Sequence, residues 1–251
     1  MESYMIRRGI RMVKLLRMHE NLKLREILIA FLSKNGRRKL LDSYHEIGIR
    51  EAKKYFTVHP DSEKYPFLEA FVFKTYGFCD YRGKTVIDVG AQTGDSVLYF
   101  SHRGAKMIYA FEPLKKNFRI LEWNVAQNKI NCKCYNVGLG DATGDVDIIV
   151  SSNMATKLLP DGIEHERIRI DKLDNFNICP DIIKIDVEGF EVAVLKGGLE
   201  TIEKAKTIII ETHSKNLQAE VKKILSGSGF NLSKIIKNYV AKNVRVEYWS
   251  K

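Results

Sequence analysis

Residues 86–95 read Val-Ile-Asp-Val-Gly-Ala-Gln-Thr-Gly-Asp, which has the form of a buried strand that leads through a tight turn into a helix. The apolar run over residues 85–89 is short, rich in β-branched side chains and followed by glycine, as is typical of a strand inside a parallel sheet. Helical spacing follows over residues 95–103, and Gly104 offers a cap for the end of that helix. A second strand is predicted over residues 105–111. The sequence therefore predicts a strand–helix–strand unit of an α/β fold.

The end of the second strand carries an acidic residue at a position typical of a nucleoside site. Glu112 follows the glycines by roughly 20 residues, the separation at which a carboxylate accepts hydrogen bonds from ribose hydroxyls. Pro113 comes next and is expected to occupy the first position of the following helix. The pair Glu112-Pro113 therefore indicates where a ribose would bind.

The turn itself favours one class of nucleoside cofactor over another. A dinucleotide site has a third glycine at the middle of the turn, and Gln92 occupies that position here. Asp88, Gly90 and Gly94, without a following Lys-Ser or Lys-Thr pair, fit a ligand with a cationic amino-acid end and no phosphate. We expect the glycines to bring bare backbone against that ligand. S-adenosylmethionine is favoured, with NAD and a purely structural turn as alternatives.

A larger set of residues is expected to contact the cofactor around this turn. The set is Asp88, Gly90, Ala91, Gly94, Asp95, Glu112, Pro113 and Asp141. Asp141 is placed near the adenine amino group, although Gly-Asp-Ala-Thr-Gly at residues 140–144 also spells an ordinary turn.

Strands and helices continue to alternate after this unit. Further strands are predicted at residues 131–137, 145–150 and 167–170, in the run from Pro180 to Asp186, and at 207–210, 233–237 and 244–249, with a helix over 218–225. The strands at 145–150 and 167–170 form a small inserted excursion resembling a hairpin, and the others complete a seven-stranded, mostly parallel sheet. Asp186, Glu188 and His213 follow two of the core strands, so we expect them at the same edge of the sheet as Asp88 and Glu112.

The run Lys184-Ile-Asp-Val-Glu-Gly-Phe-Glu191, followed by Val-Leu-Lys-Gly at 194–197, resembles the FkbM family of S-adenosylmethionine-dependent methyltransferases. Asp-Lys-Leu at 171–173 before this run and Glu-Thr-His at 211–213 after it extend the resemblance, which covers about residues 84–215. The resemblance implies the seven-stranded Rossmann-like sheet of class I methyltransferases. It also implies methyl transfer, commonly to a hydroxyl oxygen of a sugar or natural product.

A poorly acidic hydroxyl needs a base, and the candidates are Asp186 and His213. Asp186 lies at the strand end nearest the expected methyl group, and the ordinary pKa of histidine near 6.5 suits proton removal at neutral pH. We expect one of them to accept the proton and Glu188 to orient the substrate or that base. Alternatively, Asp186 binds the methionine amino group or caps a helix, Glu188 and Glu191 hold the turn, and His213 is structural. The clustered acids could instead bind a divalent metal that assists ionisation of the hydroxyl, but acids at strand ends without a defined ligand geometry are weak evidence, so no metal ligands are assigned from the sequence.

The first 39 residues hold much of the positive charge of the chain. The formal net charge is +10, and residues 1–39 contain eleven Lys/Arg and three Glu, a net of +8. Apolar residues recur there at three- and four-residue steps, which predicts amphipathic basic helices. They are suited to contact RNA or an anionic membrane surface, or else to cover an edge of the catalytic domain. We therefore divide the chain into a basic helical extension, 1–80, and a cofactor-binding domain, 81–251.

Three functions from different classes follow from these observations. The first is an O-methyltransferase acting on a sugar, a glycan or another small molecule. The second is an RNA methyltransferase that uses the basic helices, and the third is a cofactor-binding protein without catalysis. The four scattered cysteines indicate neither a disulfide framework nor a zinc site. A cytoplasmic location is expected, with a peripheral position at the membrane as a variant, and the oligomeric state is not indicated.

Overall fold

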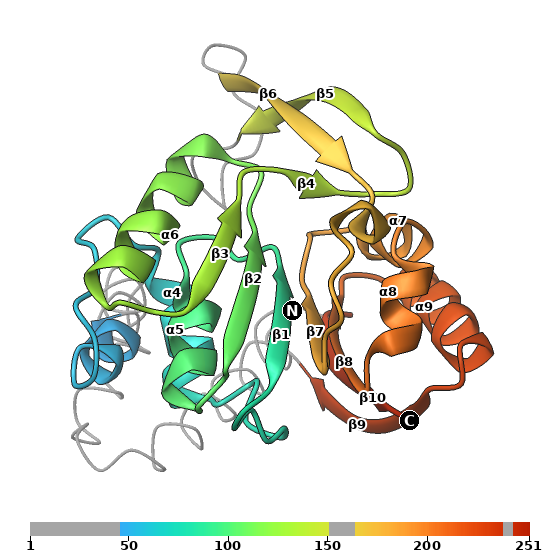
Figure 1. Cartoon of the computed structure of the whole chain (residues 1–251), viewed down its shortest axis with the longest axis horizontal. Coiled ribbons are helices and arrows are strands. Elements are labelled where there is room, and N and C mark those ends of the chain that lie inside the picture. Colours follow the sequence, from blue (N-terminus) through green and yellow to red (C-terminus); the bar gives the residue numbers. More distant parts are fainter. Residues whose placement is uncertain (1–45, 151–163, 238–242) are drawn as a thin grey trace, which may run out of the picture.

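The computed structural model describes residues 46–150, 164–237 and 243–251 (Figure 1). Its main sheet has seven strands in the order β3-β2-β1-β7-β8-β10-β9, which confirms the predicted architecture. These strands are β1 (Thr85–Val89), β2 (Met107–Phe111), β3 (Cys132–Tyr135), β7 (Ile182–Ile185), β8 (Thr207–Thr212), β9 (Asn231–Lys237) and β10 (Arg245–Ser250). The basic helices predicted within residues 1–39 lie outside the described residues.

The order of the strands creates a switch point between β1 and β7. Strands β3, β2, β1, β7 and β8 run parallel, whereas β10 is antiparallel to both β8 and β9. The chain proceeds from β1 to β2 and β3 on one side, returns to pair β7 with the free edge of β1, and then continues to β8 on the other side. Ligands of open parallel sheets bind at the carboxyl ends of the strands beside such a reversal.

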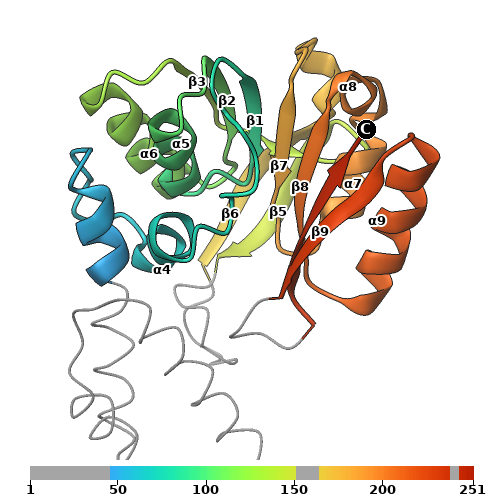
Figure 2. The ribbon, with the colours of Figure 1, turned by 90° about the horizontal axis from the view of Figure 1, so that it is seen from below.

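Two layers of helices cover the sheet, one on each face (Figure 2). One layer contains α4 (Lys64–Phe67), the π-helical turn η1 (Leu68–Val72), α5 (Asp95–His102) and α6 (Lys115–Gln127). The other contains α7 (Glu191–Lys196), α8 (Leu199–Lys204) and α9 (Lys215–Gly227). Successive residues of β1 alternate between the layers, because Val86 packs in the core under α5 and Ile87 in the core under α7 and α9. Burial on both faces explains why this strand reads as a continuous apolar run.

The excursion between β3 and β7 forms a sheet of its own. Strands β5 (Gly144–Val150) and β6 (Glu164–Asp171) pair antiparallel, which confirms the expected hairpin. A two-residue strand that the sequence did not indicate, β4 (Gly138–Leu139), pairs parallel with β6 and completes three strands. In the view of Figure 1 this sheet lies above the carboxyl ends of β2 and β3. The short η2 turn (Leu173–Phe176) then leads into the core strand β7.

The described residues before β1 pack directly against the sheet domain. Residues 46–52 are helical, and Phe67 and Phe71 are buried in the same core as Tyr99 of α5. Asn124 of α6 is fully buried, donates through Nδ2 to the main-chain oxygen of Thr93 at 2.7 Å and accepts at Oδ1 from the main-chain N–H of His59. The N-terminal segment is thereby fastened to the turn that follows β1. Within the described ranges, no helix is both long and apolar enough to cross a membrane.

Candidate active site

Both glycines of the turn after β1 are required by their neighbours in the protein. Gly90 has φ +78°, and a Cβ there would lie 1.9 Å from the main-chain oxygen of Asp186 in the adjacent chain segment. Gly94 has φ +94° and precedes α5, and a Cβ there would lie 2.9 Å from Leu121 Cδ1 of α6. Only glycine adopts these conformations readily. Contacts within the chain and the positive φ values account for both glycines, and the approach of a ligand to their backbone stays a prediction.

A buried ion pair lies beneath this turn. Asp88 is fully buried on β1, and its cross-strand partner on β7 is Lys184, whose Nζ lies 3.1 Å from Oδ1. Ser96 Oγ donates to the other oxygen of Asp88 at 2.5 Å, and Lys184 Nζ donates to the main-chain oxygen of Gly90 at 2.7 Å. Burial would lower the pKa of Lys184, but the nearby carboxylates raise it above its ordinary value. Asp88 thus holds the lysine that anchors the first residue of the turn.

Glu112 lies at the carboxyl end of β2 with its carboxylate fixed by backbone. Oε2 accepts from the N–H of Gln92 and Oε1 from the N–H of Leu114, both at 2.9 Å. Burial raises the pKa of Glu112 to about 7, although the two backbone donors act against that rise. Pro113 is not the first residue of the following helix as predicted. α6 begins at Lys115 with Leu114 as its cap, because the carboxylate of Glu112 accepts the N–H of Leu114 and holds this residue in an extended conformation ahead of the helix.

Two further features of the turn suit a polar ligand. Gln92 has φ +44°, and its buried Oε1 accepts no hydrogen bond from any described residue. An orphaned acceptor of this kind calls for a donor from outside the described chain. Asp95 at the start of α5 is also buried, and its burial raises the pKa of its carboxyl to about 7 against the opposing effect of Lys184. Ala91, immediately before Gln92, is fully buried and donates its N–H to the main-chain oxygen of Phe111.

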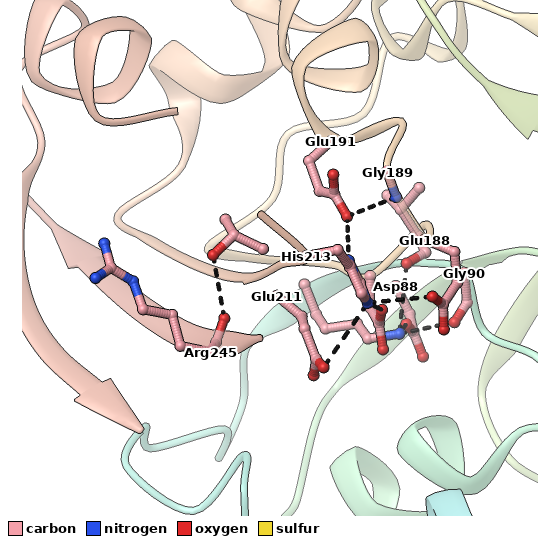
Figure 3. A network of polar contacts seen from close by, with 12 residues as sticks. Asp88, Gly90, Glu188, Gly189, Glu191, Glu211, His213 and Arg245 are labelled. Carbon is pink, nitrogen blue, oxygen red and sulfur yellow. Dashed lines mark hydrogen bonds and ion pairs between the residues drawn. The ribbon is translucent and has the colours of Figure 1, made fainter. Parts of the chain in front are cut away.

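The residues expected to perform catalysis come together at the carboxyl ends of β7 and β8 (Figure 3). His213 Nε2 lies 3.3 Å from Glu188 Oε2 and 4.0 Å from Asp186 Oδ1. The other ring nitrogen, Nδ1, lies 2.7 Å from Oε1 of the fully buried Glu191. Oε1 of Glu191 also accepts from the N–H of Gly189, so the same carboxylate fixes both the turn and the imidazole.

The charges around His213 shift its pKa away from the ordinary value that the sequence analysis assumed. Burial alone would lower its pKa, but the hydrogen bond to Glu191 and the carboxylates of Glu188 and Asp186 raise it to about 9. The imidazole is therefore protonated at neutral pH, and a protonated imidazole accepts no proton from a substrate. Glu211 on β8 lies with Oε1 3.9 Å from His213 Nε2, and burial followed by the charge of Asp186 raises its pKa to about 8.

Glu69 on η1 belongs to the same group of acids, although sequence analysis placed it in the extension. Burial raises its pKa well above the ordinary value, and the next largest causes are the charges of Glu211 and Asp186. Asp141 has a different environment: it is exposed on the turn between β4 and β5, and its Cα would lie 3.3 Å from a Cβ built at Gly197. Its contact with adenine stays a prediction.

Five residues of the site were not predicted as functional: Glu69, Gln92, Lys184, Glu191 and Glu211. Lys184 and Glu191 flank Asp186 and Glu188 in the motif and appeared only as parts of a structural turn. A lysine in the middle of an apolar strand was the available indication of a buried ion pair, since such a charge is buried only when paired. Glu69 carried no indication, because its position depends on packing between distant segments.

The model of the methyltransferase FkbM domain matches residues 88–232, which is more than half of the chain. The chain belongs to the FkbM methyltransferase family. The resemblance seen in the sequence is thereby confirmed for this FkbM methyltransferase. Residues 88–232 include the turn after β1, Glu112 and the whole group of acids around His213 except Glu69.

Individual proteins similar to this FkbM methyltransferase differ in how much they share. The hexuronic acid methyltransferase AglP of Haloferax volcanii is 28% identical over 145 residues, which span 55% of this chain and 60% of AglP. The crystal structure of an FkbM methyltransferase from Methylobacillus flagellatus has a TM-score of 0.55 at 15% identity, covering 82% of this chain and 58% of that one. A putative RNA methyltransferase from Pyrococcus horikoshii has a TM-score of 0.53 at 17% identity, covering 83% and 96%. The two structures establish the fold alone.

Proposed function

We propose that this protein transfers the methyl group of S-adenosylmethionine to a hydroxyl oxygen of a sugar or a related small molecule. The observation that carries the proposal is the placement of two groups at one switch point. The turn at residues 90–94 follows β1, and Glu112 follows β2. The acids around His213 lie at the ends of the adjacent strands β7 and β8. A sugar acceptor is supported by the hexuronic acid methyltransferase among the similar proteins.

The residues after β1 and β2 fit the proposed cofactor. Glu112 is held by two backbone donors in a fixed orientation with lone pairs left for ribose hydroxyls, and Gln92 Oε1 is an unused acceptor beside it. Asp95 offers a buried carboxylate for a cationic ammonium group. When bound, S-adenosylmethionine would supply an electrophilic methyl group, and the protein supplies alignment, which is worth up to about 7–11 kcal/mol in favourable intramolecular models.

The acceptor proton is the second requirement. In the protein without bound ions, His213 is protonated at neutral pH, which leaves Asp186 as the base among the two residues predicted from sequence. Glu188 has φ +49°, a conformation that is uncommon for a residue with a side chain, and directs its carboxylate toward His213. A positioned base typically contributes about 10²- to 10⁴-fold. Asp186→Asn is therefore expected to lower kcat by a factor in this range.

The test combines cofactor binding with product analysis. Titration calorimetry with S-adenosylhomocysteine should show binding that Glu112→Ala abolishes, with NAD as a competitor that has no effect. Methyl transfer from isotopically labelled S-adenosylmethionine is then measured on neutral sugars, uronic acids and lipid-linked glycans, and the methylated atom is identified by mass spectrometry and NMR. Absence of S-adenosylhomocysteine binding would refute the proposed cofactor, and labelled product with the methyl group on nitrogen or carbon would refute the proposed acceptor atom.

The charge of residues 1–39 supports a second candidate, an RNA acceptor. A protein that contacts phosphates through those residues would bind RNA with an affinity that falls steeply with salt concentration. Deletion of residues 1–39 would abolish that binding while leaving S-adenosylhomocysteine binding in place. RNA binding that is absent, or insensitive to salt, would exclude this candidate.

A further inference from the structure

The carboxylates of Asp186, Glu188 and Glu211 lie within 4.0 Å of Nε2 of His213, at the carboxyl ends of β7 and β8. Figure 3 shows Glu188, Glu211 and His213 at this place. One ligand atom each from Asp186, Glu188 and His213 all lie within 4.8 Å of one another. Ligands about 2.1 Å from an ion in octahedral geometry lie about 3.0 Å apart when adjacent and about 4.2 Å apart when opposite, so these separations match a shared ion after small side-chain movements. We propose that Asp186, Glu188 and His213 bind a divalent metal cation.

The imidazole is already oriented as a metal ligand. Glu191 is fully buried and holds Nδ1 of His213 at 2.7 Å, so that Nδ1 carries its proton toward Glu191 and Nε2 faces the other carboxylates. A carboxylate that hydrogen-bonds the far nitrogen of a ligating histidine is the usual outer partner in metal sites, where it fixes the ring and raises its basicity. Glu191 itself is not placed to bind the ion.

Glu211 is an independent observation that points to a cation at the same place. The residue is 9% exposed, and its carboxylate faces the imidazole of His213. Oε1 of Glu211 is directed at His213 Nε2 from 3.9 Å away. A cation close to a buried carboxylate favours its charged form. An ion held by Asp186, Glu188 and His213 would lie on the side of the imidazole that Glu211 faces.

The ligand set indicates the class of metal. Carboxylate oxygens suit Mg²⁺ and Mn²⁺, and an imidazole nitrogen favours transition metals, so Mn²⁺ or Zn²⁺ should bind more tightly than Mg²⁺. The role rests on the proposed function: the ion would lie beside the turn proposed to hold the cofactor, where it would lower the pKa of a coordinated acceptor hydroxyl. Asp186 and Glu188 would then hold the ion that activates the acceptor, and the oxygen of Asp186 not bound to the ion would accept the hydroxyl proton.

The experiment is a titration of the full-length protein, stripped with EDTA, with Mn²⁺ followed by electron paramagnetic resonance of the free ion. One Mn²⁺ is expected per chain. Glu188→Gln removes a proposed ligand whose side chain is 70% exposed, so the fold should persist while the affinity falls at least tenfold. Glu191→Gln should weaken binding about 10- to 100-fold through loss of orientation. Glu203→Gln changes an exposed acid of α8 that is not among the proposed ligands; it is the matched control and should bind as the wild type does.

Two results would overturn the metal site: no binding at millimolar Mn²⁺, or equal affinity in Glu188→Gln and Glu203→Gln. Titration with S-adenosylhomocysteine on the same samples separates this proposal from the proposed function. If S-adenosylhomocysteine binds and Mn²⁺ does not, the metal site is refuted and the methyltransferase proposal stands. If Mn²⁺ binds at this site and S-adenosylhomocysteine does not, the proposed cofactor is refuted and the metal site stands.

Discussion

Replacing Asp95 with asparagine should make the free protein more stable at neutral and alkaline pH, although Asp95 is a predicted cofactor ligand. The carboxyl group is buried at the start of α5, and its burial raises the pKa from 3.8 to about 7. A pKa that is higher in the folded than in the unfolded state means that ionisation favours unfolding. Asparagine has nearly the same shape and carries no charge to desolvate.

The size and the pH range of the effect follow from that shift. A difference of about 3 pKa units corresponds to about 4 kcal/mol, and loss of a negative charge at a helix start removes about 0.3–1 kcal/mol of it. The contribution of the neutral carboxyl is fully present below about pH 4 and is lost as the pH rises through 7. The difference in free energy of unfolding between Asp95→Asn and wild type should therefore grow between pH 4 and 7. Above pH 7 it should stay at about 3 kcal/mol.

Urea unfolding of both proteins at pH 5, 6, 7 and 8 measures this gap. Glu203→Gln serves as the control and should stay within about 0.5 kcal/mol of wild type at every pH, because the side chain is exposed. In Asp95→Asn, the affinity for S-adenosylhomocysteine should fall about tenfold or more if the carboxylate contacts the ammonium group. A gap between Asp95→Asn and wild type that does not grow from pH 5 to pH 8 would refute the argument from burial.

Three other predictions concern the contacts that hold the site. Lys184→Met should lower the free energy of unfolding by about 3–5 kcal/mol, because it leaves the charge of Asp88 buried without its partner. The double change with Asp88→Asn should recover most of this loss. A loss under about 1 kcal/mol in urea unfolding of Lys184→Met would contradict the argument. Gly94→Ala should lower the Tm by about 2–4 °C for each kcal/mol lost, since φ is +94° and the added Cβ meets a leucine of α6, and an unchanged Tm in calorimetry would count against the strain. Glu191→Gln should lower the pKa of His213 from about 9 in the EDTA-treated protein, as followed by NMR titration, and a pKa that stays near 9 would mean that the other acids suffice.

Local patterns in the sequence predicted most of the sheet. The run 85–89 is apolar because both of its faces are covered, and it ends at a glycine with positive φ, so strand and turn were visible together. The hairpin of β5 and β6 was visible for a similar reason. Strand β4 was missed because two residues carry no period, and its pairing with β6 joins segments about 30 residues apart.

The site was predicted in its residues more fully than in its electrostatics. Asp186, Glu188 and His213 were found because their strands end at one edge, which is a property of topology. The raised pKa of His213 was not predicted, because it depends on Glu191 and on charges that other elements bring close to the imidazole. Pro113 was misplaced by two residues for a related reason: the side chain of Glu112 holds the backbone ahead of α6, and no helix propensity reports that contact.

The pairing of β1 with β7 also constrains how the chain acquires its structure during synthesis. Val89 and Lys184 are in contact across 95 positions of the sequence. At about 5–20 residues per second, a ribosome needs roughly 5–20 s to add the intervening segment, and during that time β1, β2 and β3 expose an unpaired edge and Asp88 lacks its partner. Fragments that end before β7 should consequently aggregate through that edge. The central lysine that anchors the turn therefore also marks the point in translation after which the nascent sheet closes.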